Sequence, residues 1–541
     1  MSTRRKIPTK SELIQLQKLY KTDEKIGERL GGVPAYLVAY WRRKKNVPKH
    51  SVPKFSEADI RNLWERFGDD DRCGLELGIS KAAFYNWRRR YGIREKPAFL
   101  KLEQLELALP GVKRRGQAVS LYGKQTAVQK ILARAAGEEK APVGDLLVVE
   151  PDMTVAHQNA GEVVRQFREI GTEYVWNPER MTIALSRCSD CEGPAPADDH
   201  YLAREFVRRQ GIPNFYDVYE GSCHQLAVDN GHVLPGGVIL GTEPYATSYG
   251  ALSAFGAGIS PKEMATVWAG GKIWLKVPPT IRVDITGRRT RGVYTRDITL
   301  YMLKQLGVDR GEYAMIEFHG SGVSHMSISE RITLCNTAAD MHAKAAMCPF
   351  EAVTRRYLNP RTGSHYQPIL PDKDAEYIEM FQFNIDQLPP QIAGPNSIEE
   401  VRPVKDLDGL SVQLVAVGTG ANGRFDDLRV AADIVKGKKL HGDCRMLVIP
   451  ASRQVYIEAL KKGLIRQFVE AGATVMDPSA GLHADRLGEL LASGERCLAT
   501  TNGSVLKTAA GLAAEMFLCS PATAAASALN GRITDPTPYV R

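Results

Sequence analysis

Three cysteines and two histidines have the residue types, and part of the spacing, of a metal site. Cys188 and Cys191 form a Cys-x-x-Cys pair, and Cys223 directly precedes His224. With His483, these thiolates and imidazoles are ligands that zinc and iron–sulfur clusters use. The alternative is that the thiols are buried or incidental, because one Cys-x-x-Cys pair does not by itself bring further ligands together. The sequence leaves both interpretations open.

A glycine-rich segment at residues 418–424 is the second candidate for chemistry. It reads Gly-Thr-Gly-Ala-Asn-Gly-Arg and follows an apolar run at residues 412–417. The run predicts a buried strand. Active sites in folds with parallel sheets gather at the carboxyl ends of strands. The segment is therefore well placed to contribute to a site.

Apolar strands and amphipathic helices alternate from about residue 124 onward. Buried strands are predicted at residues 146–149, 181–185, 238–240, 412–417 and 446–449. Helices are predicted between them at residues 127–136, 160–170, 201–210 and 455–471. This alternation indicates an α/β fold with several units and largely parallel sheets.

Residues 418–424 resemble the Gly-Ser-Cys-Thr-Asn-Gly-Arg loop of the aconitase superfamily, especially the large subunits of isopropylmalate dehydratase and homoaconitase. Further landmarks of the resemblance occur at residues 130–137, 234–237, 249–252, 317–320, 450–453 and 520–536. The resemblance covers residues 123–541 and implies an α/β/α body with three subdomains. It also implies hydro-lyase chemistry, which dehydrates or isomerises a hydroxy acid, and a separate small-subunit partner that carries the swivelling domain.

The resemblance fails at the positions that hold the family's cofactor. In the family, the loop cysteine and two cysteines of a Cys-Gly-Pro-Cys turn bind a [4Fe-4S] cluster. The matching positions here are Gly420, Ala480 and His483. We therefore expect a hydro-lyase fold without the usual cluster, with another metal or cluster at the cysteines as the alternative.

The resemblance also assigns catalytic residues position by position. His224 lies in a retained Gly-x-x-His-Gln turn and is the best single acid–base candidate. Glu243 and Tyr245 stand in the turn where the family has Asp-Ser-His. Asp340 replaces the glutamate of the family's Asn-Met-x-x-Glu helix. These four residues are the candidate catalytic group.

Substrate contacts are assigned in the same way, to Arg187, Asn422, Arg424, Asn502 and Lys507. The family's Asn-Arg-Asn-Phe-x-Gly-Arg loop matches residues 502–508, where both arginines are absent. A single lysine cannot replace two bidentate arginine clamps. A di- or tricarboxylate bound in the family's usual way is therefore not expected.

The first hundred residues form a basic region that contains a repeat. Residues 1–100 hold 23 Lys and Arg against 12 Asp and Glu, a balance of +11 in a chain whose net charge is +9. Residues 28–45 and 75–90 each predict a helix, a glycine turn and a second helix that ends in Trp and basic residues. Preceding helices are predicted at residues 12–20 and 57–67, the second capped by Ser56. This pattern is typical of a tandem helix-turn-helix.

The basic ends of the two repeats are the candidate nucleic-acid contact. They comprise Arg42, Arg43, Lys44, Arg88, Arg89 and Arg90. Such groups would neutralise the phosphates of DNA or RNA and carry little sequence information. The alternative is a solvated face or a protein-docking surface. Trp41 and Trp87 are assigned to the cores of the repeats. We take residues 1–95 as an all-α module and residues 96–122 as a linker with a short helix at 102–109.

Composition places the chain among cytoplasmic globular proteins. No apolar run is long enough to cross a membrane, and the polar start is not that of a secretory signal. The nine cysteines are scattered, which suits reduced thiols. Two functions are favoured: a divergent hydro-lyase large subunit, and a nucleic-acid-binding regulator whose aconitase-like body senses a metabolite or metal. A third interpretation is a scaffold that retains only the fold.

Overall fold

The computed structural model divides the chain into two compact units, Met1–Pro97 and Ala98–Arg541. The residues that it describes are 7–20, 22–47, 55–67, 70–93, 99–101, 124–185, 196–395, 397–478, 490–506 and 513–540. Several sequence predictions lie outside these residues: Arg187, Cys188, Cys191, Ala480, His483, Lys507 and the helix at 102–109.

The described part of the first unit consists of two similar groups of three helices. The first group is α1 (Lys10–Tyr20), α2 (Asp23–Arg29) and α3 (Ala35–Lys44), and the second is α4 (Glu57–Phe67), α5 (Asp70–Glu76) and α6 (Lys81–Arg90). Each group encloses its own small core, against which Trp41 or Trp87 packs as predicted. Ser56 Oγ accepts a hydrogen bond from the Asp59 amide at 3.1 Å, which confirms the predicted cap.

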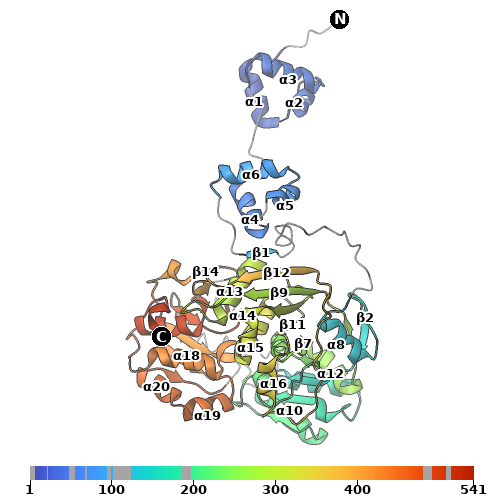
Figure 1. The fold of residues 1–541 in the computed structure, drawn as a ribbon, viewed down its shortest axis with the longest axis vertical. Coiled ribbons are helices and arrows are strands. Elements are labelled where there is room, and N and C mark those ends of the chain that lie inside the picture. Colours follow the sequence, from blue (N-terminus) through green and yellow to red (C-terminus); the bar gives the residue numbers. More distant parts are fainter. Residues whose placement is uncertain are drawn as a thin grey trace. The chain divides into compact units, whose positions relative to one another are not determined.

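Three sheets of mainly parallel strands form the second unit (Figure 1). The first sheet has the order β5-β4-β3-β6-β7, and all its strands are parallel. Its strands are β3 (Met153–Ala156), β4 (Met181–Ala184), β5 (Asn214–Tyr216), β6 (Val238–Gly241) and β7 (Phe255–Gly258). The second sheet has the order β1-β12-β9-β10-β11. Its strands are β1 (Phe99–Lys101), β9 (Thr280–Thr286), β10 (Met315–His319), β11 (Ala345–Met347) and β12 (Glu379–Asn384).

The third sheet carries the glycine-rich segment and has the order β14-β13-β19-β18-β15-β16-β17. Its strands are β13 (Gln391–Ala393), β14 (Val401–Pro403), β15 (Leu414–Gly418), β16 (Arg445–Ile449), β17 (Thr474–Val475), β18 (Arg496–Ala499) and β19 (Glu515–Cys519). Strands β15 to β19 are parallel, and β13 runs antiparallel to β19. A separate antiparallel pair joins β2 (Leu146–Val149) to β8 (Ile273–Lys276).

Helices connect and cover these sheets, which confirms the predicted α/β class. In the first half of the unit they are α8 (Ala127–Ala136), α9 (Ala160–Ile170), α10 (Pro196–Gln210), α11 (Cys223–Asp229), α12 (Pro261–Gly270), α13 (Thr295–Leu306), α14 (Ser321–Ser324) and α15 (Ile328–Thr337). They continue with α16 (Ala352–Leu358), α17 (Thr419–Asn422), α18 (Phe425–Val435), α19 (Arg453–Lys461), α20 (Leu464–Ala471) and α23 (Pro521–Asn530). The 3₁₀ segments η3 (Pro244–Leu252) and η4 (Ala338–Met341) lie near the site described below.

Three elements differ from the sequence predictions. The strand at 146–149 is only partly buried: Leu146 and Val148 are 66% and 60% exposed while Val149 is buried, because β2 pairs with β8 alone. The helix predicted at 455–471 is two helices, broken where Gly463 adopts a φ of +76°. Phe99–Lys101, inside the predicted linker, pairs with β12. None of the described helices is long and apolar enough to span a bilayer.

Candidate active site

The carboxyl ends of the first sheet bring together a histidine, a cysteine and a glutamate. Glu243 follows β6, while Cys223 and His224 begin α11 after β5. Because the strands are parallel, these ends meet at one edge of the sheet. His224 Nδ1 lies 2.9 Å from Glu243 Oε1, and Cys223 Sγ lies 3.1 Å from the same oxygen. His224 is buried, with 4% of its surface exposed.

The charge of Glu243 fixes the roles of its neighbours. Burial alone would raise the pKa of Glu243, but the charge and hydrogen bond of His224 and the charge of His157 lower it to about 2. The group is therefore a carboxylate, and Nδ1–H of His224 donates to it. In the neutral ring Nε2 is then the acceptor, and it has no hydrogen-bond partner among the described residues. Burial raises the pKa of Cys223, so its thiol stays protonated and donates.

One group of potential metal ligands appears within the described chain: His157, Cys223 and Glu243. One ligand atom from each lies within 4.8 Å of the others. Of the metal ligands predicted from sequence, only Cys223 is in this group, since Cys188, Cys191 and His483 lie outside the described residues. His157 follows β3 and belongs to no motif, which is why sequence reasoning missed it.

The glycine-rich segment brings the third sheet against His224. A Cβ atom built on Gly420 would lie 2.4 Å from His224 Nε2. The residue has no side chain that could bind a cluster, and a cysteine there would overlap the imidazole. At this position the chain does not fit the family's [4Fe-4S] cluster. The other two matching positions, Ala480 and His483, lie outside the described residues.

A backbone bridge fixes the first sheet to the third beside the same histidine. Gly221 and Ser452 form an isolated antiparallel bridge, and the Ser222 amide donates to Ala451 O at 2.9 Å. Gly221 has a φ of +143°, and a Cβ there would lie 2.6 Å from Ala451 O. Only glycine allows this approach.

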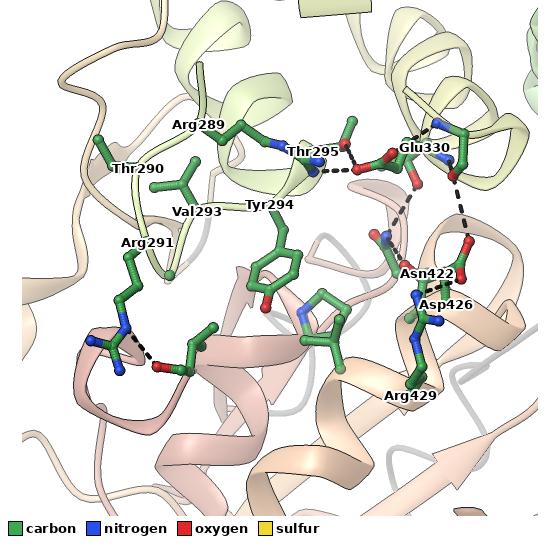
Figure 2. A pocket seen from close by; sticks show the side chains of 17 residues that line it. Arg289, Thr290, Arg291, Val293, Tyr294, Thr295, Glu330, Asn422, Asp426 and Arg429 are labelled. Atoms are coloured by element: carbon green, nitrogen blue, oxygen red, sulfur yellow. Dashed lines mark hydrogen bonds and ion pairs between the residues drawn. The ribbon is translucent and has the colours of Figure 1, made fainter. Parts of the chain in front are cut away.

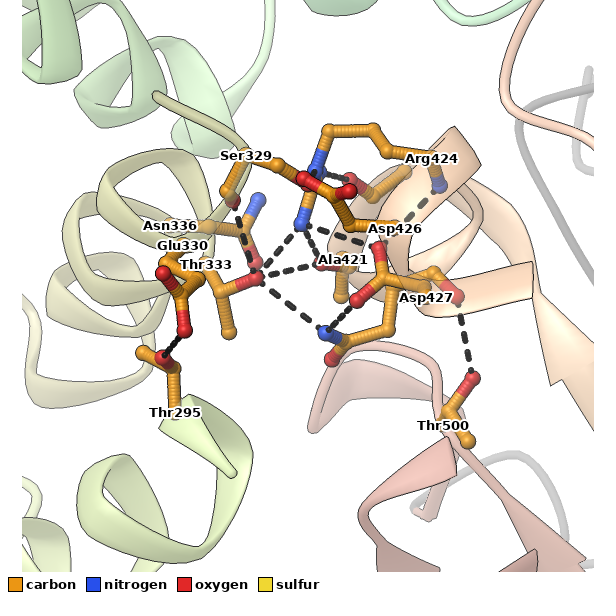
Figure 3. A network of polar contacts seen from close by, with 12 residues as sticks. Thr295, Ser329, Glu330, Thr333, Asn336, Ala421, Arg424, Asp426, Asp427 and Thr500 are labelled. Atoms are coloured by element: carbon orange, nitrogen blue, oxygen red, sulfur yellow. Dashed lines mark hydrogen bonds and ion pairs between the residues drawn. The ribbon is translucent and has the colours of Figure 1, made fainter. Parts of the chain in front are cut away.

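Asn422 and Arg424, both predicted to contact substrate, lie in an internal polar network (Figure 3). Arg424 Nη1 donates to Gly420 O at 2.8 Å, and its Nη2 donates to Thr333 Oγ1 at 2.5 Å. Asn422 Nδ2 donates to Thr333 Oγ1 at 3.1 Å and to Asp427 Oδ1 at 3.0 Å. Arg424 is 3% exposed, so it holds the glycine-rich segment in place.

Tyr245 and Asp340 form a second polar centre. The Tyr245 hydroxyl lies 3.3 Å from Asp340 Oδ1 and 3.1 Å from Ser504 Oγ. Burial raises the pKa of Asp340, and the charge of Arg296 and the hydrogen bond from Tyr245 oppose this rise. Burial and the charge of Asp340 raise the pKa of Tyr245, which keeps its hydroxyl protonated.

Arg296 is a further residue of this centre, and no sequence motif pointed to it. It is fully buried in α13, where its Nη2 donates to Thr501 O at 2.8 Å and its Nη1 to Thr337 Oγ1 at 3.3 Å. Its Nε, Asp340 Oδ2 and Asn502 Oδ1 have no hydrogen-bond partner among the described residues. Buried polar atoms left without partners are the places where a ligand or water completes a site.

A larger pocket borders the polar network of the glycine-rich segment, with Asn422 in its lining (Figure 2). Its volume is about 670 Å³, and its lining includes Tyr294 and Val430. Two of its three arginines are ion-paired, Arg289 with Glu330 and Arg429 with Asp426, while Arg291 Nε donates to Val540 O. A smaller cavity of about 450 Å³ borders Glu243 itself. We therefore place the candidate site by its unmatched polar atoms and not by pocket volume.

Two of the six predicted nucleic-acid contacts occupy internal positions. Arg42 Nη2 lies 3.1 Å from Asp23 Oδ2, and Arg88 Nε lies 2.8 Å from Asp70 Oδ1. Arg42 is 8% exposed. These guanidinium groups stabilise the helical groups, which is a role that sequence reasoning did not assign. The other four, Arg43, Lys44, Arg89 and Arg90, are exposed.

Comparison with known proteins places this arrangement in a family. The model of the aconitase family (aconitate hydratase) matches residues 198–409 and 402–531. A 3-isopropylmalate dehydratase large subunit of Methanopyrus kandleri is 42% identical, over 77% of this chain and 100% of that protein. A probable methanogen homoaconitase large subunit of Methanosarcina mazei is 37% identical, over 72% of this chain and 99% of that protein. The structure of Thermococcus kodakaraensis aconitase X has a TM-score of 0.42 at 12% identity, over 71% of this chain and 91% of that one. The family model and the two large-subunit relatives show that the chain belongs to the aconitase family.

Proposed function

We propose that the second unit is the large subunit of a hydro-lyase that removes water from a hydroxy acid. The observation that carries the proposal is the His224–Glu243 pair, whose Nε2 faces Gly420 and has no described partner. The large-subunit relatives are dehydratases and homoaconitases by name. Their large subunits imply a small-subunit partner for this chain.

In the proposed reaction His224 is the base. Elimination of water needs a base for a proton on the carbon next to a carboxylate and an acid for the departing hydroxyl. Glu243 accepts Nδ1–H of His224, which leaves Nε2 with a lone pair and stabilises the imidazolium after proton transfer. Nε2 is buried beside Gly420, where the absence of a side chain avoids an overlap with the ring, so a substrate would reach it only if the glycine-rich segment shifts.

Asp340 and Tyr245 form the proposed acid. Burial raises the pKa of Asp340 and so favours its protonated form, and in that form Asp340 can pass its proton through Tyr245 to the leaving hydroxyl. Arg296 is the described cation beside this pair, and it can bind one carboxylate of the substrate. One arginine in place of two favours a monocarboxylic hydroxy acid or one whose second carboxylate binds the small subunit.

We propose that the family's [4Fe-4S] cluster is not bound in the usual way. Supporting this are Gly420 at one ligand position and the side chains Ala480 and His483 at the others. When bound, such a cluster polarises the substrate hydroxyl. If a different metal serves that purpose, His157, Cys223 and Glu243 are the described donors, and Cys188, Cys191 and His483 are further candidates.

Metal analysis of protein purified without oxygen tests the cofactor part. We expect less than one iron and no acid-labile sulfide per chain. Stoichiometric iron with sulfide would overturn it and indicate a relocated cluster. The double variant Cys188→Ser/Cys191→Ser would then lose its iron if the cluster is bound by that pair and keep it if the cluster is bound elsewhere.

Kinetics with a candidate hydroxy acid test the enzyme part. The full chain is combined with the small subunit of a related isopropylmalate dehydratase and assayed with 3-isopropylmalate by the ultraviolet absorbance of the unsaturated product. His224→Gln should lower kcat about 10²–10⁴-fold, the usual contribution of general acid–base catalysis. The matched control His325→Gln changes a histidine that bonds only the Ser321 carbonyl and should retain activity. Equal activity of both variants would exclude His224 as the base.

The second candidate function is a regulator in which the same pocket binds a metabolite without turnover. The concentration of positive charge in the first hundred residues favours it. Calorimetric binding of a hydroxy acid with no product formed, abolished by Arg296→Met, would support the regulator over the enzyme.

A further inference from the structure

The two helical groups of the first unit share one internal design. Gly27 in α2 lies so close to the turn that a Cβ would be 2.0 Å from Val33 O, and a Cβ on Gly74 in α5 would be 2.8 Å from Ile79 O. Each helix pair therefore closes through a glycine that tolerates no side chain. This contact fixes how the last helix of each group is presented.

An arginine at the equivalent position fixes the last helix in each group. Arg42 donates from Nε and Nη2 to Asp23 and from Nη1 to Val47 O at 3.3 Å. Arg88 donates from Nε and Nη2 to Asp70 and from Nη1 to Ile93 O at 2.8 Å. A planar guanidinium that grips a carboxylate and a carbonyl leaves little freedom to α3 or α6. The first basic residue of each run is thus a positioning residue.

The next two basic residues of each run lie on the surface, where Lys44 Nζ is 5.8 Å from the Tyr40 ring centroid and Arg90 Cζ is 5.4 Å from that of Trp87. Arg43 and Lys44 end α3, and Arg89 and Arg90 end α6; all four are exposed. None of them is ion-paired with a described carboxylate. Tyr36 and Tyr40 precede Arg43 and Lys44 at helical spacing and are 71% and 54% exposed. Each last helix therefore presents an exposed polar face that ends in two cations without an ion pair to a described carboxylate.

We propose that α3 and α6 are two recognition helices that bind double-stranded DNA. An exposed helix of this size fits the major groove, and the second helix of a helix-turn-helix occupies it. Arg43, Lys44, Arg89 and Arg90 neutralise phosphates at the groove edge. The tyrosines of α3, and Tyr85 and Asn86 of α6, are placed to contact base edges. The inference is independent of catalysis by the second unit.

Removal of the four exposed cations tests the proposal on the full chain. The variant Arg43→Gln/Lys44→Gln/Arg89→Gln/Arg90→Gln is compared with Lys10→Gln/Lys18→Gln/Arg29→Gln/Arg61→Gln. The control removes four exposed charges from α1, α2 and α4. Fluorescence anisotropy with a labelled 30-base-pair duplex of mixed sequence, over a range of salt concentrations, gives the affinity and its salt slope. Circular dichroism verifies that both variants are folded.

We expect the α3/α6 variant to bind at least tenfold more weakly, with a slope of log K against log salt reduced by about 3–4, since each lost phosphate contact removes about 0.9. The control should lose less than threefold. An equal loss of affinity in the two variants would show that binding depends only on net charge, which would overturn the proposal. Failure of the parent chain to bind the duplex, or tighter binding of single-stranded RNA than of the duplex, would also overturn it.

Discussion

The Nε2 atom of His224 lies where a side chain at Gly420 would begin, 2.4 Å from the Cβ position. The ring cannot retreat without breaking its hydrogen bond to Glu243. Gly420→Ala should therefore cost about 1–3 kcal/mol of unfolding free energy, as overpacking of a buried site does. Gly270→Ala, where a Cβ meets no atom within 4 Å, is the control. Chemical denaturation measures the free energy of unfolding of both variants. An unchanged value for Gly420→Ala would show that the His224 ring can adopt another position without loss of stability.

Glu243 should make the protein sensitive to acid. Its pKa is lowered to about 2 from an ordinary value of 4.5. A lowered pKa stabilises the fold above pH 4.5, and this stabilisation is lost as the pH falls from 4.5 to 2. The shift corresponds to about 3 kcal/mol. Unfolding measured across this range should show a shallower decline for Glu243→Gln, while exposed Glu458→Gln should follow the parent.

Arg296 and Asp340 should be energetically coupled. Both are buried, and each charge stabilises the other. Arg296→Met alone leaves a buried carboxyl uncompensated, whereas Arg296→Met with Asp340→Asn removes both charges. A double-mutant cycle on unfolding free energy should give a coupling of about 1–3 kcal/mol. If the effects of the two substitutions on the free energy of unfolding are additive, Arg296 and Asp340 do not interact.

Arg88 and Arg89 are neighbours in sequence with opposite expected effects. Arg88→Met breaks a largely buried ion pair with Asp70 and should cost the second helical group about 3 kcal/mol. Arg89→Met changes an exposed side chain and should cost less than about 0.5 kcal/mol. Hydrogen exchange of amides in α4 to α6 is the measurement. Similar protection in the two variants would contradict the positioning role.

Gly463 should resist substitution for conformational reasons alone. Its φ is +76°, and a Cβ would meet no atom within 4 Å. Gly463→Ala should therefore cost about 1 kcal/mol, because an L-residue is strained there. Gly442 also has open space around it but no positive φ, so Gly442→Ala should be neutral in thermal unfolding. A stabilised Gly463→Ala would indicate that α19 and α20 can fuse.

Local sequence patterns predicted the helices and strands of the second unit well, but they predicted the burial of these elements less well. Helix α9 has the bounds expected from its apolar period, because one stripe of the helix packs on the first sheet. The apolar run at 146–149 is a strand too, but its burial depended on which strands flank it. That information lies more than a hundred residues away, at β8.

The candidate site likewise contains residues that the sequence indicated and residues that only long-range contacts reveal. His224 and Glu243 were predicted together because the family resemblance places each in a turn, and the structure brings His224 Nδ1 to 2.9 Å from Glu243 Oε1. Arg296 was not predicted, since its partner carbonyl, Thr501, is 205 residues away and no local pattern marks the contact. Arg42 and Arg88 looked like their basic neighbours, because sequence alone does not reveal which arginine of a run faces an aspartate.

Because the two helical groups have separate cores, each can bind duplex DNA on its own in the proposed complex, and this affects the overall affinity. Val47 packs in the first core and Phe55 packs against the second, so the chain between them can span at most about 29 Å and keeps the two groups close when the duplex is bound as proposed. Once one group is docked, its tethered twin samples nearby sites at a local concentration in the millimolar range. Two individually weak contacts can thus produce tight, readily reversible attachment.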